Sequence, residues 1–116
     1  MVSVKKSVKR EAMPEEAPLD LRVGHLLRIS SYLDMATLSM WAQRRAEVVM
    51  GMAEASVKGY GPGGPEGPDE KLLARLRDLI REAREYYAAD DFPAAMARMR
   101  VAEDLVCLYT IRITRE

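Results

Sequence analysis

Residues 59–69, GYGPGGPEGPD, constrain the fold more than any other stretch, because five of these eleven positions are glycine and three are proline. Such a segment can neither propagate a helix nor pair as a central strand. It therefore predicts a loop between two halves of similar length, and we assign residues 61–69 as a linker. The loop lacks the GxxxxGK[ST] spacing of a phosphate-binding loop, so we do not expect it to bind phosphate.

The half before the loop, residues 19–60, has the apolar spacing of a helix. Steps of four and three residues alternate along one stripe, which is partly apolar: Leu19, Val23, Leu26, Ser30, Leu33, Thr37 and Met40. We expect one long helix here. Ser30–Ser31 followed by Asp34 resembles a capping box, so a helix broken at this point is the alternative.

The half after the loop, residues 70–116, predicts two helices joined by a short turn at residues 89–91. Each helix has its own apolar stripe: Leu72, Leu76, Leu79, Ala83 and Tyr86, then Ala95, Met99, Ala102, Val106, Tyr109 and Ile113. Asp69 and Asp91 are expected to cap the two helices. Residues 19–116 are thus predicted to form one all-α domain, a small helical bundle of three to four helices with a C-terminal antiparallel helical hairpin.

Part of this hairpin, residues 83–105, resembles a single tetratricopeptide helical hairpin. The matching positions are Ala83, Tyr86, Tyr87, Asp91, Phe92, Ala95 and Ala102. Small archaeal helical-bundle proteins of unknown function look similar in the same stretch. Asp90 replaces the turn glycine of the family, and the opening Trp and closing Pro have no counterpart. Because the match occurs once, a stacked array of repeats is excluded, and the resemblance implies only a tightly packed helix pair without catalytic residues.

Composition narrows the class of protein. The chain is 48% hydrophobic and carries 18 basic against 18 acidic residues, which is unlike a disordered chain. No 18-residue stretch is free of charge, so we expect no membrane span. The charged leader, residues 1–18, has no apolar core of a secretory signal, which predicts a cytoplasmic protein. Asn is absent and Gln occurs once; this bias is typical of a heat-adapted source, and a GC-rich genome would give a similar one.

No residue pattern predicts catalysis, a cofactor or a metal site. His25, the only histidine, has no orienting partner in the sequence and is interpreted as a packing or surface residue. Cys107, the only cysteine, is interpreted as a buried, unreactive thiol. Four carboxylates cluster in the C-terminal half, but no Glu-x-x-His motif of a bundle metal site accompanies them: Glu82, Glu85, Asp90 and Asp91.

The leading hypothesis is a non-enzymatic helical protein–protein interaction or scaffold protein that self-associates. The apolar side chains around residues 48–52 cover too much of the helix for one small core, which predicts a subunit interface. The interface candidates are Trp41, Val48, Val49 and Met52. The alternative is a small nucleic-acid-associated accessory protein. It would use the basic leader and an arginine-rich helix face, through Lys5, Lys6, Lys9, Arg10, Arg77, Arg81 and Arg84.

Overall fold

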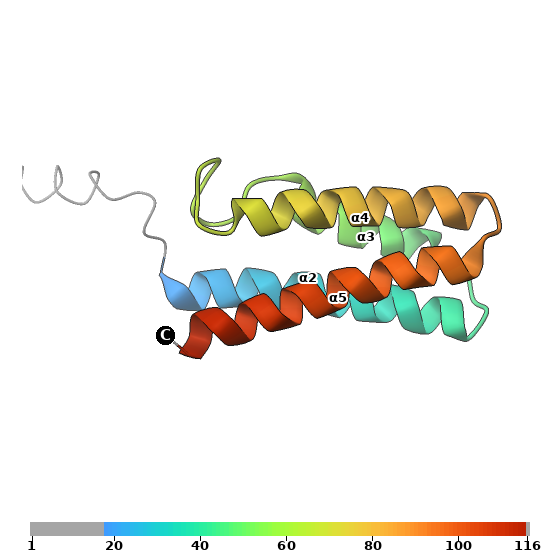
Figure 1. Cartoon of the computed structure of the whole chain (residues 1–116), viewed down its shortest axis with the longest axis horizontal. Coiled ribbons are helices and arrows are strands. Elements are labelled where there is room, and N and C mark those ends of the chain that lie inside the picture. The colour runs from blue at the N-terminus through green and yellow to red at the C-terminus, as the bar shows by residue number, and fades with distance from the viewer. Residues whose placement is uncertain (1–17, 116) are drawn as a thin grey trace, which may run out of the picture.

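The computed structural model describes residues 18–115 of the 116-residue chain, and this part is all-α (Figure 1). Its four helices confirm the predicted small bundle, and no residue in 18–115 lies in a strand. The helices are α2 (Leu19–Trp41), α3 (Glu47–Lys58), α4 (Glu70–Ala88) and α5 (Phe92–Arg115).

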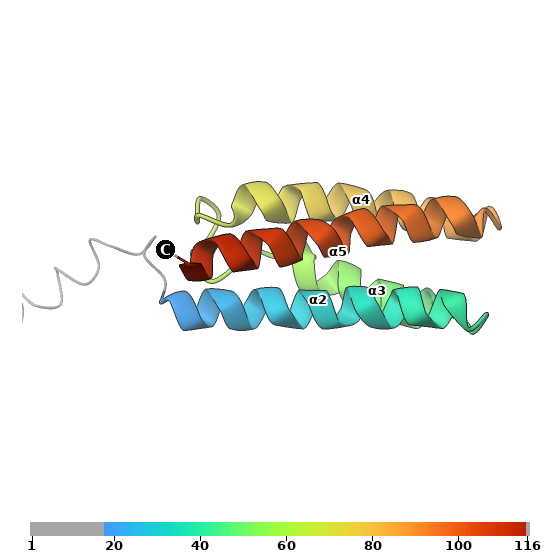
Figure 2. The ribbon, with the colours of Figure 1, turned by 60° about the horizontal axis from the view of Figure 1, so that its bottom comes forward.

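The four helices form a closed ring in which each helix packs on two neighbours. Helix α2 packs on α3 and α5, and α4 packs on the same two helices from the opposite side. Successive helices run in opposite directions, so the end of α5 lies beside the start of α2 (Figures 1 and 2). This up-and-down order follows from connections that are too short for a crossover.

The core is a set of aliphatic and methionine side chains from all four helices. On each helix they recur at three- or four-residue intervals, which places them on the face turned toward the bundle axis. The largest of them are fully buried: Leu26, Ile29, Leu33, Met50, Val57, Leu73, Leu76, Ile80, Met99 and Val106.

The N-terminal half differs from both predictions, because its helix neither runs through to residue 60 nor breaks at Ser30–Ser31. Helix α2 passes through the two serines and ends at Trp41. Gln43 then adopts a left-handed backbone with φ of 57°. The N–H of Arg44 donates to the carbonyl of Ser39 at 2.8 Å, which completes a Schellman motif. The chain therefore reverses at residues 42–46, and α3 returns along α2.

The C-terminal helix pair is confirmed, and its turn also forms a Schellman motif. Asp90 has a φ of 63°, and the N–H of Asp91 donates to the carbonyl of Tyr86 at 2.9 Å. The carboxylate of Asp91 then accepts the N–H of Ala94 at 3.3 Å, as predicted for an N-cap. Small side chains at the α4–α5 contact are fully buried and let the two backbones approach closely: Ala83, Ala95 and Ala102.

Candidate interaction surface

The residues predicted to form a subunit interface lie on two helices, and three of the four are exposed. Trp41, the last residue of α2, is 68% exposed, while Val48 and Met52 on α3 are 73% and 41% exposed. Val49 instead packs partly buried against the core, and Met50 is fully buried within it. The apolar excess expected at residues 48–52 is therefore confined to Val48 and Met52, which share one face of α3.

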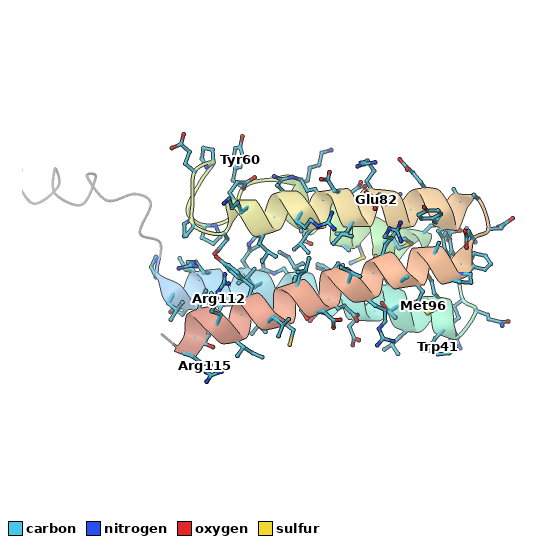
Figure 3. All side chains as sticks on the ribbon, in the orientation of Figure 1. Trp41, Tyr60, Glu82, Met96, Arg112 and Arg115 are labelled. Carbon is cyan, nitrogen blue, oxygen red and sulfur yellow. The ribbon has the colours of Figure 1, made fainter. Side chains whose placement is uncertain are left out.

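Two further apolar side chains near this end of the bundle were not predicted. Leu38 is exposed on α2, three residues before Trp41 and hence on the same helix face. Phe92 is exposed at the start of α5 and lines a hollow of about 410 Å³ with residues of the α2–α3 turn. Figure 3 places Trp41 at this end. We call the set the turn-end surface: Leu38, Trp41, Val48, Met52 and Phe92.

The turn beneath this surface is held by an aromatic residue of α4. The N–H of Ala46 donates to the Tyr87 hydroxyl at 3.1 Å, and the rings of Tyr87 and Phe92 lie 5.2 Å apart. Arg45 lies 3.8 Å from Glu47, and both side chains are solvent-exposed. The apolar residues are thus bordered by charges of both signs.

The arginine-rich helix face of the nucleic-acid alternative lies on α4, and its three arginines pair with acidic side chains. Arg77 donates to Glu70, Arg81 to Asp78 and Glu85, and Arg84 to Glu54. These pairs lower the positive charge that α4 offers a phosphate backbone. The leader residues of that hypothesis lie outside the described part of the chain: Lys5, Lys6, Lys9 and Arg10. The nucleic-acid role stays a prediction.

His25 packs at the α2–α3 contact. Its Nε2 lies 3.1 Å from the carbonyl oxygen of Ser56 and donates to it, which agrees with the packing role expected from the sequence. The clustered carboxylates are also engaged locally: Glu82 accepts from Arg98 at 3.0 Å, and Asp91 caps α5. Within residues 18–115, no three His, Cys, Asp or Glu side chains are grouped so that they could hold a metal ion.

The prediction of a buried thiol was wrong, because Cys107 is exposed on α5. The buried stripe of this helix runs through Ala95, Met99, Ala102 and Val106. Cys107 directly follows Val106 and is therefore rotated by about 100° away from the core. The run LVCLY, residues 105–109, is mostly apolar. Its composition therefore did not indicate which of its side chains face the core.

Cys107 opens onto a groove between α2 and α5 that the sequence did not reveal. The groove has a volume of about 570 Å³, and its lining mixes carboxylates with apolar and small polar side chains: Leu27, Ser30, Ser31, Asp34, Glu103, Asp104 and Cys107. The Thr37 hydroxyl lies 3.3 Å from Oε2 of Glu103. Burial, and then the nearby charge of Asp34, raises the pKa of Glu103. The three acidic residues Asp34, Glu103 and Asp104 therefore make the groove acidic.

Asp69 was expected to cap α4 with its side chain, but its carboxylate turns inward instead. Nη2 of Arg22 lies 2.7 Å from Oδ1 of Asp69, and the Tyr109 hydroxyl donates to the same oxygen at 2.6 Å. Burial, followed by the hydrogen bond to Asp69, raises the pKa of Tyr109. This cluster joins α2, α5 and the start of α4, and no local sequence pattern indicates it.

Comparison of the chain with protein-family models, curated proteins and solved structures found no significant match. The described helices include none that combines the length and apolarity needed to cross a membrane.

Proposed function

We propose that this chain is a non-catalytic helical interaction protein that self-associates through the turn-end surface. The observation that carries the proposal is the exposure of Trp41, which is 68% accessible to solvent although its indole is large and mostly apolar. Tryptophan is among the residues that most often dominate binding energy at protein interfaces. Exposed apolar side chains that lie together are typical of interaction sites, and Leu38 lies beside Trp41 on one face of α2.

A second copy is the proposed partner because the charges around this surface are self-complementary. Arg44 and Arg45 lie on the α2–α3 turn, and Glu47, Asp90 and Asp91 lie at the same end of the bundle. In an isologous dimer each copy presents both groups, so basic residues of one copy can face acidic residues of the other. The net charge of zero also leaves little long-range repulsion between copies.

Three of the side chains considered for chemistry, His25, Glu82 and Glu85, have structural partners, and this supports the non-catalytic part of the proposal. His25 donates to the backbone of Ser56. Glu82 and Glu85 accept from Arg98 and Arg81. The hydrogen bond of His25 joins α2 to α3, and the ion pair of Glu82 joins α4 to α5, so both side chains serve helix packing.

The test is the molar mass of the full chain by light scattering at two concentrations. We expect a dimer, and we expect Trp41→Ser to weaken it by at least about tenfold, as for an interface anchor. Leu108→Ser is the matched control, because Leu108 is equally exposed but lies toward the other end of α5. A monomer at both concentrations would overturn self-association. A dimer that Trp41→Ser leaves intact would overturn this surface.

A further inference from the structure

The groove between α2 and α5 is suited to a basic, partly apolar peptide segment. It is about 570 Å³ in volume, which is space for several side chains. Asp34 lines it from α2, and Glu103 and Asp104 line it from α5. Leu27, exposed on the same side of α2, supplies an apolar wall. Figure 2 shows the two helices side by side.

The carboxylates of the groove are not neutralised by ion pairs with basic side chains of the described residues. Among the ion pairs of residues 18–115, none involves Asp34, Glu103 or Asp104. Arg100 is close enough to act electrostatically on Glu103, but burial and the neighbouring acids outweigh it. The residues that line the groove include three carboxylates and no lysine or arginine, so the lining has a net negative charge. A cationic occupant would relieve this repulsion.

The chain itself carries a segment of matching chemistry. Residues 4–10, VKKSVKR, contain three lysines and one arginine together with two valines spaced by four residues. We propose that the groove binds residues 4–10 of the same chain, with their basic side chains facing the three carboxylates. Complementary charge selects this segment over the acidic residues that follow it.

The connection is long enough for the segment to reach the groove of its own bundle. Residues 11–18 link it to α2, and these eight residues span up to about 26 Å when extended at about 3.3 Å each. Asp34 lies fifteen residues beyond Leu19, which is about 22 Å along the helix at 1.5 Å per residue. Binding within one chain also has the advantage of a high effective concentration. Asp34 lies four residues before Leu38 on the same face of α2, so the groove adjoins the turn-end surface. The experiments below therefore distinguish binding within one chain from self-association.

Cys107 provides the experiment, since it is the only cysteine and it lines the groove. A nitroxide attached to Cys107 of the full ¹⁵N-labelled chain should broaden the amide signals of residues 4–10. In the matched control, Cys107→Ser combined with Ala74→Cys moves the nitroxide to an exposed site on α4, and these amides should keep their intensity. Unbroadened leader amides in the Cys107-labelled chain would overturn the proposal.

Charge reversal tests the ionic contacts. The variant Lys5→Glu/Lys6→Glu/Lys9→Glu should restore the intensity of the leader amides. Asp34→Lys/Asp104→Lys added to it should bring the broadening back. In the chain without a nitroxide, the triple variant should also shift the amide signals of Ser31 and Glu103. An unchanged spectrum in both experiments would contradict the ionic contact.

Mixing labels separates this inference from the proposed function. When unlabelled chains that carry the nitroxide are mixed with ¹⁵N chains that lack it, binding within one chain predicts no broadening of residues 4–10. Broadening of residues 4–10 in the mixture would overturn the proposal in favour of a second copy as the source of the segment. The molar mass reports on self-association separately, whichever result is obtained.

Discussion

Asp69 is the one charged residue that is buried within residues 18–115. Its side chain is 4% exposed, and Arg22 and Tyr109 both direct hydrogen-bond donors at it. The three residues come from distant parts of the sequence, so their hydrogen bonds couple α2, α5 and the Gly/Pro loop. A buried carboxylate is tolerated only when such partners satisfy it.

We therefore expect Asp69→Asn to lower the free energy of unfolding by about 2–3 kcal/mol, because it leaves the largely buried Arg22 without its counter-charge. Urea unfolding measures this, and an unchanged m-value would show that the native contact is what was lost. Asp78→Asn is the control. Asp78 pairs with Arg81 on the surface, so its loss should change stability by less than about 0.5 kcal/mol. Equal effects of the two variants would contradict the role of Asp69.

Tyr109 makes stability depend on pH in the alkaline range. Burial and the bond to Asp69 raise its pKa above the ordinary value of 10.0, so the folded chain keeps a phenolic proton that the unfolded chain releases. The stabilisation is complete below pH 10 and is lost as the pH rises through the folded-state pKa. At neutral pH, Tyr109→Phe should cost about 1 kcal/mol for the lost hydrogen bond. Urea unfolding at a series of pH values should show this difference shrinking above pH 10, whereas Tyr60→Phe, at an exposed site, should show no such trend.

At the scale of elements, the helix interiors and the turn at residues 89–91 were predictable, whereas the end of α2 and the start of α3 were not. Apolar residues at intervals of three and four define the helices, because this spacing depends only on local geometry. Both Schellman turns place a residue other than glycine, Gln43 or Asp90, at the left-handed position. The expected glycine signature is therefore missing. For this reason the turn at residues 42–46 could not be located from the sequence.

The Gly/Pro loop contains one glycine that packing requires and one that it does not. A Cβ on Gly67 would lie 2.8 Å from the carbonyl carbon of Gly63, whereas a Cβ on Gly59 would meet no atom within 4 Å. We expect Gly67→Ala to cost about 1–3 kcal/mol, because the backbone must shift. Gly59→Ala should be neutral or stabilising by less than about 1 kcal/mol. Thermal unfolding of the two variants measures the difference, and equal melting temperatures would rule out the close approach of Gly67 to Gly63.

At the scale of the whole molecule, α3 is the weakest side of the ring. It has 12 residues, whereas the other helices have 19 to 24. Only three of its own residues are buried: Met50, Ala53 and Val57. Short helices depend on tertiary packing for their stability. We expect the central amides of α3 to exchange hydrogen at least about tenfold faster than those of α4, and equal protection would show that all four helices open together.

The sequence alone determined that this chain is helical, that a Gly/Pro loop divides it and that its C-terminal half is a helix pair. These features follow from local spacing and backbone preference. The predicted stripe of the first helix also included Leu26 and Leu33, which enter the core. Only the tertiary structure decided that α2 ends at Trp41 and that α3 folds back along it. It also decided the candidate sites, because residues far apart in the chain meet there, such as Asp34 and Glu103 across the groove. Such meetings depend on how the helices pack around a common core, and local periodicity does not encode that arrangement.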